Sequence, residues 1–458
     1  MDFTGKKVAV IGLGISNAGL IRFLAGQGAD VTACDRKELH GLEQILTGLE
    51  GISFKLHSGP SYLERLDEYD AIFLTPGMRR DFPELERAKT RGALISSEIK
   101  EFMNRCPGKI IGITGSSGKT TTTTLVGSIM RRDFPKVYIG GNIGTPLINH
   151  LPEMDGQTWA VLELSSFQLQ ETERSPEIAA ITNITPNHLD MHASMEEYIN
   201  AKKNIFRFQG SGGILILNHD YEITRDMASE APGKVYFFSS RRELHEGAYL
   251  SRDQLWLKIS GEPAPVCRRE DLKLLGLHNV ENVLLTALIT SLAGVGLERI
   301  REAVTGFTGV EHLLELVRIL DGVFYYNDSK STTPTSAIAG VLAMDKPAIL
   351  IAGGYDKKIP FDEFAAVVID KCKTVVLLGD TAPLIESALL RSMKEKGRKI
   401  PVLRGKTFPE AVEMAREAAA AGDAVLLSPA CASYDMFKDY NERGDLFKKI
   451  VGEFAPKG

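Results

Sequence analysis

Short apolar runs alternate with helical patterns along most of the chain. Residues 7–11 (KVAVI) form a β-branched run, which a Gly-x-Gly turn and a helical pattern from Asn17 to Gln27 follow. A second run at Ala29–Asp35 ends in an acid, and a third at Asp70–Thr75 is closed by Pro76-Gly77. Strand, helix and strand in this order predict a small parallel α/β unit.

The same alternation returns twice further along the chain. A second region has strand runs at Lys109–Ile113, Trp159–Leu162, Ile178–Asn183 and Ile214–Asn218. It also has a Leu- and Ala-rich helical pattern at Asn279–Leu292. A third region begins near Gly309 and has strand runs at Val323–Tyr326, Ala348–Ala352, Thr374–Leu378 and Ala424–Leu427. At roughly 150 residues per domain, 458 residues also suggest about three domains. We therefore predict an α/β protein with domains at 1–97, 98–309 and 310–458.

Composition and charge narrow the class of protein. Hydrophobic residues make up 43% and charged residues 25% of the chain, as in a globular protein with sizeable cores. The net charge is −5 and no basic run exceeds two residues, which argues against a nucleic-acid-binding surface. Because no apolar stretch reaches about 18 residues, we expect no membrane-spanning segment. Five scattered cysteines without ligand spacing fit a reducing, cytoplasmic setting rather than a disulfide framework or a zinc site.

The first glycine turn, Gly12-Leu13-Gly14, lies between a predicted strand and a predicted helix. Glycine permits the tight turn and the close approach of a phosphate, and the helix N-terminus behind it favours an anion. Asp35 ends the second strand, where Rossmann-like domains read a ribose or a base. Asn17 stands where a plain NAD fingerprint has glycine, so the pattern favours some nucleotide over NAD. A glycine turn needed only for packing is the alternative interpretation.

A second glycine turn, GITGSSGKTTT at 112–122, follows the strand that opens the middle region. Ile113 stands where the strict P-loop has its first glycine, but the remaining physics is intact. Successive backbone N–H groups can face a phosphate, Lys119 supplies positive charge, and the Thr120 hydroxyl can reach Mg²⁺. The order strand, loop, lysine and helix predicts a central mononucleotide-binding domain of the P-loop type.

Polar residues gather after successive elements of this middle region. An apolar strand ends in Glu163, and the next strand is followed by Asn187-His188-Leu189-Asp190. A helical pattern at Met195–Phe206 then carries Lys202. Glu163 alone would more often be a surface acid and His188 a structural loop histidine, but the ends of parallel strands meet at one edge. Together these residues predict a metal site.

Eight segments of the chain resemble the Mur ligases, in the order that this family shows. They are 112–120 (GITGSSGKT), 140–144 (GGNIG), 163–169 (ELSSFQL), 183–192 (NITPNHLDMH), 201–206 (AKKNIF), 277–282 (LHNVEN), 327–330 (NDSK) and 427–444 (LSPACASYDMFKDYNERG). The resemblance covers nearly the whole chain. It implies a three-domain α/β fold with Rossmann-like end domains around the P-loop-type domain. It also implies an ATP-dependent amino-acid ligase of peptidoglycan synthesis, with UDP held by the first glycine turn and ATP by the second.

Within the family, the N-terminal Gly-x-Gly unit and the run at 427–444 are most similar to the branch that joins D-glutamate to UDP-N-acetylmuramoyl-L-alanine. The resemblance implies an acyl-phosphate intermediate, two Mg²⁺ ions, and a Lys202 that becomes a carbamate by adding CO₂. Lys203 is the neighbouring alternative, but Lys202 follows Tyr198 at the family's Y-x-x-x-K spacing. We expect a cytoplasmic monomer that binds neither nucleic acid nor membrane.

The resemblance also assigns residues to each ligand. Catalysis falls to Lys119, Glu163, His188 and Lys202, and metal binding to Thr120, Glu163, His188 and Lys202. The positions that match ATP contacts are Gly115, Ser116, Ser117, Gly118, Lys119, Thr120, Thr121, Asn279 and Asp328. Those that match the UDP substrate are Ile15, Ser16, Asp35, Arg36, Gly77 and Asn142. Those that match the D-glutamate site are Lys330, Thr332, Lys357, Ser433, Tyr434 and Tyr440.

Two departures and three rival functions remain open on the sequence. His312-Leu313 stands where the family usually shows His-Arg, and Tyr434 and Tyr440 stand where leucine and phenylalanine can occur, which leaves one ATP contact and the pocket size undetermined. A folylpolyglutamate synthase shares the ATP chemistry but lacks the N-terminal Gly-x-Gly domain. The sister ligase that adds L-alanine tends to have histidine where this chain has Ser116-Ser117. A nucleotide-dependent switch would not need Glu163, His188 and Lys202 together.

Overall fold

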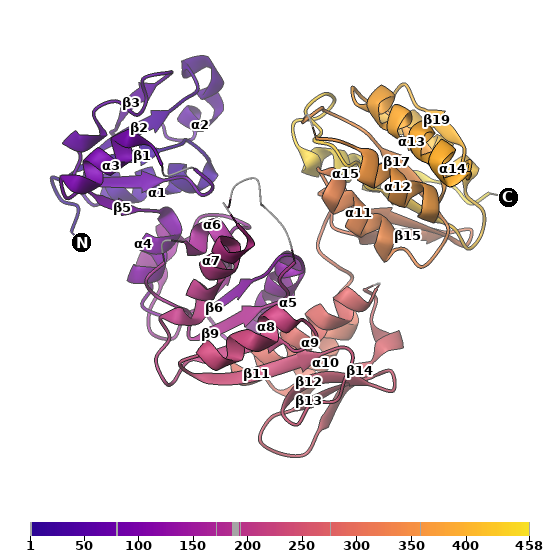
Figure 1. Ribbon diagram of the computed structural model, residues 1–458, viewed down its shortest axis with the longest axis horizontal. Helices are drawn as coiled ribbons and strands as arrows, with labels where there is room; N and C mark the ends of the chain where they lie inside the picture. Colours follow the sequence, from indigo (N-terminus) through magenta and orange to yellow (C-terminus); the bar gives the residue numbers. More distant parts are fainter. Residues whose placement is uncertain are drawn as a thin grey trace. The chain divides into compact units, whose positions relative to one another are not determined.

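The computed structural model describes residues 2–78, 81–170, 172–185, 192, 194–274, 276–357 and 359–457. The chain forms two compact units (Figure 1). The first contains Met1–Asp271 and Val280–Thr305, and the second contains Leu272–Asn279 and Gly306–Gly458. Three α/β sheets of five, nine and six strands build these units, so the predicted fold class is confirmed.

The five-stranded sheet of the first unit is parallel throughout, with the order β3-β2-β1-β4-β5. Its strands are β1 (Lys7–Ile11), β2 (Asp30–Asp35), β3 (Lys55–Ser58), β4 (Ala71–Leu74) and β5 (Leu94–Ser96). The helices are α1 (Ile15–Gly26), η1 (Leu39–Gly41), α2 (Glu43–Thr47), η2 (Leu66–Glu68), α3 (Pro83–Thr90) and α4 (Glu98–Arg105). The three strands and the helix that the hydrophobic pattern predicts here are confirmed as β1, β2, β4 and α1.

The nine-stranded sheet of the same unit has the order β14-β13-β12-β11-β10-β9-β6-β8-β7. It is parallel from β7 to β12, and β12, β13 and β14 pair antiparallel. The strands are β6 (Lys109–Thr114), β7 (Val137–Gly141), β8 (Trp159–Glu163), β9 (Ile178–Ile181), β10 (Ile214–Asn218), β11 (Lys234–Ser239), β12 (Gly247–Ser251), β13 (Gln254–Lys258) and β14 (Ala264–Arg268). The antiparallel edge is a feature that the alternation of strands and helices does not predict.

Helices surround this sheet between its strands. They are α5 (Lys119–Asp133), η3 (Leu147–Glu153), α6 (Ser166–Leu169), α7 (Met195–Arg207), α8 (Glu222–Asp226), η4 (Met227–Glu230), η5 (Arg269–Asp271), α9 (Leu277–Leu292) and α10 (Leu297–Gly306). One hydrophobic core joins both sheets of the unit, since Leu20 and Phe102 belong to the same buried cluster as Ile148, Ala160 and Ile205. The two sheets are therefore held together by apolar burial.

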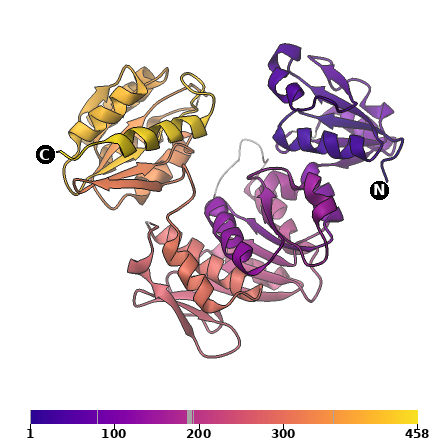
Figure 2. The same cartoon turned by 180° about the vertical axis from the view of Figure 1, so that it is seen from behind.

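The six-stranded sheet of the second unit has the order β15-β16-β20-β17-β18-β19, and only the β15–β16 pair is antiparallel. Its strands are β15 (Glu315–Leu320), β16 (Val323–Asn327), β17 (Ala348–Ala352), β18 (Cys372–Leu377), β19 (Val402–Arg404) and β20 (Ala424–Leu427). Its helices are α11 (Pro334–Ala343), α12 (Asp362–Lys371), α13 (Ala382–Lys396), α14 (Phe408–Ala418) and α15 (Tyr440–Glu453). Figure 2 shows this unit from behind.

Helices cover both faces of the six-stranded sheet. Alternate strand residues point to opposite faces, so Leu350 packs with α11, α12 and α13 while Ile349 packs with α14 and α15. Strands buried on both faces read as continuous apolar runs, which is why the pattern locates β17 and β20 correctly. Within the described part of the chain, no helix has both the length and the apolar character that crossing a membrane requires. All five cysteines are buried and free.

Candidate functional site

The first glycine turn follows β1, the strand at which the order of the five-stranded sheet reverses. Gly12 adopts a φ of 85°, and a Cβ there would approach Thr75 Cγ2 to 2.8 Å. The Leu13 amide donates to Asp35 Oδ2 at 2.6 Å, and the Asn17 side chain donates to the carbonyl of Gly12 at 2.7 Å. Asp35, a predicted contact of the UDP substrate, thus also holds the turn in shape.

The start of α1 behind this turn can receive an anion. Gly14 is the N-cap and offers no side-chain acceptor to the helix. The first N–H groups of a helix have no intrahelical partner, and the helix dipole favours negative charge there. Ser16 is half-buried in this first turn and Arg36 is exposed just after β2. This arrangement suits a diphosphate at a sheet's switch point.

The second glycine turn connects β6 to α5, and it is braced by the residues that follow β9. Ser116 N–H donates to the carbonyl of Asn183 at 2.9 Å, and Ser117 N–H donates to Asn183 Oδ1 at 3.0 Å. Thr182 Oγ1 donates to the Ser117 carbonyl at 2.6 Å. Lys119 Nζ folds back onto the carbonyls of Gly115 at 3.0 Å and Ser116 at 3.2 Å. The lysine that should meet a phosphate is therefore already positioned over the loop.

Gly115→Ala is expected to weaken nucleotide binding about tenfold and to cost about 3 kcal/mol of unfolding free energy. Gly115 has a φ of 146°, and a Cβ there would collide with Thr182 Oγ1 and approach the Asn183 carbonyl to 3.0 Å. Thermal unfolding and titration with a fluorescent ATP analogue measure both effects. Gly210→Ala is the control, because a Cβ at Gly210 meets nothing within 4 Å. Equal behaviour of the two variants would contradict a loop shaped by this glycine.

Glu163 ends β8 beside this loop and is 2% exposed. Its Oε1 accepts a hydrogen bond from Asn142 Nδ2 at 2.8 Å, and its carbonyl accepts from the Asn142 N–H at 2.8 Å. Its Oε2 is buried and has no hydrogen-bond partner among the described residues. A buried carboxylate oxygen without a partner is costly unless a cation pairs with it, so this donor fits Mg²⁺. Half-buried Thr120 lies in the first turn of α5.

Lys202 reaches the same loop from α7. Its Nζ donates to the Gly115 carbonyl at 2.9 Å and to Thr114 Oγ1 at 3.2 Å, and the residue is 1% exposed. Burial lowers the pKa of Lys202 well below its ordinary value, the charge of Lys119 lowers it further, and Glu163 opposes the shift. By contrast, Lys203 Nζ forms an ion pair with Glu230 at 2.6 Å. The two neighbouring lysines therefore occupy different environments, and Lys202 is the one in the site.

His188 and Asp190 lie outside the described residues, so the predicted place of His188 in the metal site stays a proposal. His192, in the same segment, is described and stacks on Phe167 with ring centroids 5.0 Å apart. Its Nε2 contacts Ser166 Oγ at 2.9 Å. Tyr198 OH contacts Ser116 Oγ at 3.0 Å, which ties α7 to the loop. The sequence-based predictions gave no role to His192, the last residue of the NITPNHLDMH motif, or to Thr182, which precedes the motif.

Three neighbouring strand ends of the second unit gather the residues predicted for D-glutamate. Lys330 and Thr332 follow β16, Lys357 follows β17, and the segment with Ser433 and Tyr434 follows β20. β20 lies between β16 and β17, so these loops meet at one edge of the sheet. Lys357 Nζ donates to Thr332 Oγ1 at 3.2 Å, and the Thr332 N–H donates to the Lys330 carbonyl at 2.9 Å.

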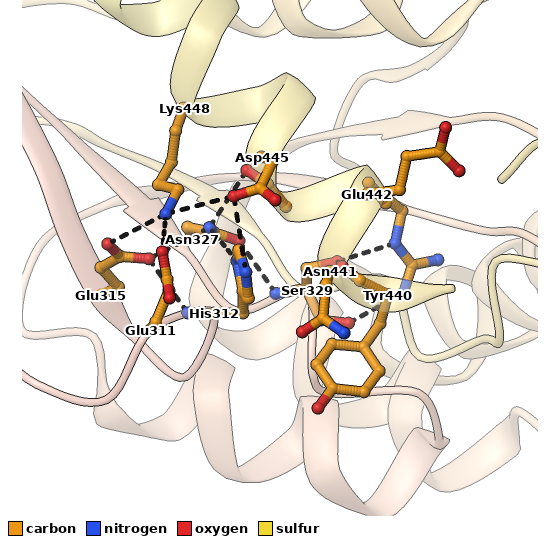
Figure 3. A network of polar contacts seen from close by, with 12 residues as sticks. Glu311, His312, Glu315, Asn327, Ser329, Tyr440, Asn441, Glu442, Asp445 and Lys448 are labelled. Carbon is orange, nitrogen blue, oxygen red and sulfur yellow. Dashed lines mark hydrogen bonds and ion pairs between the residues drawn. The ribbon is translucent and has the colours of Figure 1, made fainter. Parts of the chain in front are cut away.

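The aromatic members of this group are placed differently from one another. Tyr434 is 66% exposed and packs edge-on against Tyr355. Tyr440 begins α15, and its carbonyl accepts a hydrogen bond from Ser329 Oγ at 2.7 Å. Figure 3 shows Ser329 and Tyr440 in this arrangement. Ser433 is buried, and its carbonyl accepts from the Phe437 N–H at 2.8 Å.

Asp328 is fully enclosed at the end of β16. Ser428 Oγ donates to its Oδ2 at 2.7 Å, and the Leu314 N–H donates to its Oδ1 at 3.2 Å. Burial raises the pKa of Asp328 to about 7, although these hydrogen bonds oppose the shift. Asp328 and Asn279, the latter in the first turn of α9, belong to the second unit, whereas the other predicted ATP contacts belong to the first.

Asp328→Asn is expected to flatten the pH dependence of thermal stability between about pH 4 and 7. Because the pKa of Asp328 is raised on folding, the folded protein holds a proton that the unfolded chain releases in this window. The group therefore stabilises the fold at low pH, and this contribution falls by up to about 1.4 kcal/mol per pH unit as pH rises. Melting temperatures across the window test this, with exposed Asp345→Asn as the control. If the melting temperature of Asp328→Asn depends on pH as steeply as that of the wild-type protein, the prediction is wrong.

The His312-Leu313 departure lies in a lysine-centred polar network. Lys448 Nζ pairs with Glu311, with Asp445 at 3.3 Å and with Glu315 at 3.8 Å (Figure 3). The ligand atoms of Glu311, His312 and Asp445 lie within 4.8 Å of one another, which is a spacing that a metal ion could use. The Lys448 ammonium already supplies the positive charge there, so this cluster is better described as a salt-bridge network that holds α15.

Comparison with known proteins identifies the family. The Mur ligase MurD-like N-terminal domain matches residues 6–97, the Mur ligase middle domain matches residues 113–290, and the Mur ligase glutamate ligase domain matches residues 314–431. UDP-N-acetylmuramoylalanine–D-glutamate ligase from Symbiobacterium thermophilum is 48% identical over 448 residues, which cover 97% of this chain and 98% of that protein. The chain belongs to the Mur ligase family.

Other relatives and solved structures agree with this membership. The protein of the same name from Clostridium novyi is 48% identical over 446 residues, 97% of this chain and 96% of that protein. UDP-N-acetylmuramate-alanine ligase from Thermotoga maritima has a TM-score of 0.59 at 19% identity, covering 98% of this chain and 99% of that chain. MurF from Acinetobacter baumannii has a TM-score of 0.58 at 16% identity, covering 93% and 91%. These two structural likenesses show that the Mur ligase fold extends along the chain.

Proposed function

We propose that this Mur ligase joins D-glutamate to UDP-N-acetylmuramoyl-L-alanine in peptidoglycan precursor synthesis, with ATP converted to ADP and phosphate. The observation that carries the proposal is the 48% identity with ligases of that name over 97% of the chain. The site supports it, because Lys119 and Lys202 meet over a P-loop beside a buried carboxylate, Glu163. A switch protein would not need this constellation.

The reaction proceeds through two bond exchanges on the substrates. First, a carboxylate oxygen of the alanyl group bonds to the γ-phosphorus of ATP as the bond to the β-phosphate oxygen breaks, which gives an acyl phosphate and ADP. The neutral amine of D-glutamate then attacks the acyl carbon, phosphate leaves, and the amine proton passes to solvent. Two anions must approach in the first step, and each unit-charge repulsion at 4 Å costs about 4 kcal/mol at an effective dielectric constant of about 20.

The chain's own groups offset this repulsion. Lys119 and the N–H groups in the first turn of α5 bind and orient the phosphates, because the N–H groups of Ser116 and Ser117 already donate to Asn183. Thr120, Glu163, His188 and Lys202 are the residues that would hold two Mg²⁺ ions. Mg²⁺ would supply charge neutralisation at the phosphates. We also propose that Lys202 carries CO₂ as a carbamate, since an amine whose pKa is lowered by burial is more readily neutral and able to react.

We further propose the division of labour among the segments. Residues 1–97 bind the UDP substrate through Ile15, Ser16, Asp35, Arg36 and Gly77, and residues 98–309 bind ATP and contribute Asn142 to the sugar-peptide part. Residues 310–458 bind D-glutamate through Lys330, Thr332, Lys357, Ser433, Tyr434 and Tyr440. Two lysines suit an amino acid with two carboxylates. The protein acts in the cytoplasm as a monomer, apart from membranes and nucleic acid.

Phosphate release with UDP-N-acetylmuramoyl-L-alanine and a panel of D- and L-amino acids tests the proposal. We expect release that depends on ATP and is highest with D-glutamate. A preference for L-alanine on UDP-N-acetylmuramate would instead identify the sister ligase, and glutamate addition to a folate would identify a folylpolyglutamate synthase. Nucleotide hydrolysis that needs no amino acid would favour a switch.

A further inference from the structure

Arg443 is a buried cation to which the proposed mechanism assigns no role. It lies in the first turn of α15 and is 1% exposed. A positive charge near the N-terminus of a helix opposes the helix dipole, and burying a charge is costly unless it is well paired. Burial lowers the pKa of Arg443 to about 10, so the guanidinium stays charged at neutral pH. An arginine held at this cost needs an explanation.

The guanidinium makes its hydrogen bonds to two loops. Nε donates to Ser329 Oγ at 3.0 Å, and Nη2 donates to the Ser329 carbonyl at 2.8 Å. Nη1 donates to the carbonyls of Cys431 at 3.2 Å and Ala432 at 3.3 Å. Ser329 precedes Lys330, and Ala432 precedes Ser433. Arg443 therefore ties together the two segments that carry proposed D-glutamate contacts.

The third loop of this edge is joined to the same point. The Tyr355 N–H donates to the Ala432 carbonyl at 2.9 Å, in an isolated bridge just after β17. The guanidinium and this bridge together hold the loops after β16, β17 and β20. A rigid fork that satisfies several carbonyls at once is a role that arginine fills and lysine does not.

No carboxylate pairs with Arg443, within 4.0 Å, among the residues that the structure describes. All of its recorded acceptors are neutral carbonyl or hydroxyl oxygens. Burial lowers the pKa of the Lys357 ammonium group, and the positive charge of Arg443 lowers it further. Asp435 and Asp328 oppose the effect of burial on the pKa of Arg443, so acidic groups nearby partly balance its charge, while its hydrogen bonds go to the loops.

We infer that Arg443 is a positioning residue of the amino-acid site, which holds the loops of Lys330 and Ser433 in register for a doubly anionic amino acid. The inference rests on the proposed function, since it takes D-glutamate as the acceptor. All of its recorded hydrogen bonds go to the loops, so it acts on the amino acid through the residues that these loops carry.

Arg443→Met and Arg443→Lys, compared by steady-state kinetics and thermal unfolding, test the inference. We expect Arg443→Met to raise the KM for D-glutamate about 50-fold and Arg443→Lys about fivefold, because lysine keeps a donor for part of this set of carbonyls but loses the fork that joins the loops. The KM values for ATP and UDP-N-acetylmuramoyl-L-alanine should stay within about twofold. A parallel rise in all three KM values, or equal effects of the two variants on D-glutamate, would overturn the inference.

Arg318 provides a matched control. Its guanidinium also donates to three carbonyls, those of Val451, Gly452 and Phe454, but at the far end of α15. Arg318→Met should lower the melting temperature and leave the KM for D-glutamate unchanged. A rise in that KM equal to that of Arg443→Met would overturn the inference, because loss of stability alone would then explain both.

Ser329→Ala keeps the test decisive if Arg443→Met does not fold. This variant removes the acceptor of Nε and keeps the charge, so the KM for D-glutamate should rise about threefold with the KM for ATP unchanged. An unchanged KM for D-glutamate would overturn the inference. If the wild-type protein releases no phosphate in response to D-glutamate, the proposed function itself is wrong. If the wild-type protein is active but the variants change all three KM values alike, only this inference is wrong.

Discussion

Lys202→Ala is expected to reduce turnover by about 10³-fold or more, the scale of losing charge stabilisation at a metal site. Lys202 is buried and its Nζ lies 2.9 Å from the Gly115 carbonyl of the phosphate loop. An ammonium there would repel a divalent cation, whereas a carbamate would attract it. Because burial and the charge of Lys119 lower the pKa of Lys202, the neutral amine that reacts with CO₂ is more available than in an ordinary lysine.

Lys203→Ala is the matched control, since it removes the same side chain one position along α7. Lys203 pairs with Glu230, and one step along a helix turns the side chain by about 100° to another face. Steady-state phosphate release should be near normal in this variant. An inactive Lys203→Ala beside a normal Lys202→Ala would show that the assignment is wrong by one residue.

Carbon dioxide provides a second test of the same lysine. Wild-type activity should fall in CO₂-depleted buffer at mildly acidic pH, where protonation removes the reactive amine, and recover on adding bicarbonate. Formate or acetate should partly restore Lys202→Ala by supplying a carboxylate at the vacated position. Activity that is indifferent to bicarbonate in wild-type protein, together with an active Lys202→Ala, would remove the carbamate from the proposal.

Lys119→Ala is expected to slow acyl-phosphate formation about 10³-fold and to leave the affinity for UDP-N-acetylmuramoyl-L-alanine unchanged. Lys119 lies over the loop between β6 and α5, whereas the turn proposed for UDP follows β1 in a different sheet. A defect in one turn should therefore leave binding at the other turn unchanged. Rapid-quench detection of the acyl phosphate and calorimetric titration of the UDP substrate measure them independently.

Lys136→Ala controls for the loss of a positive charge. Lys136 belongs to the same unit but is half-buried and pairs with Asp155 at 2.6 Å. Its replacement should leave both measurements unchanged. An equal loss of UDP-substrate affinity in Lys119→Ala would show that one turn does not serve one substrate.

The hydrophobic pattern was most informative about strands buried on both faces. β10, β17 and β20 have the bounds that the pattern predicts, because a central parallel strand is a continuous apolar run between turn residues. The pattern missed all six edge strands: β3, β5, β7, β14, β15 and β19. Edge strands are short, polar or half-exposed, so neither their length nor their periodicity distinguishes them from loops.

Residue identity also determined much of the candidate site. The glycine turns, Lys119, Glu163 and Lys202 are recognised in the sequence because phosphate and metal chemistry restrict the residue types that can serve. The structure describes all of these, and it brings Lys119 and Lys202 to the same carbonyl, that of Gly115. The predicted ligand His188 lies outside the described residues and stays a proposal.

The sequence by itself determined the α/β class, the family resemblance and the kinds of group available for chemistry. Only the tertiary structure decided that Asn142 pairs with Glu163, that Lys119 and Lys202 meet at the Gly115 carbonyl, and that Arg443 joins Ser329 to Ala432. The hydrophobic pattern of a segment shows which of its residues are buried and which face solvent. It depends only on residues that are close together in the sequence. Contacts between residues 87 or 114 positions apart depend instead on which strands lie side by side, and the sheet order that sets this is a property of the whole fold.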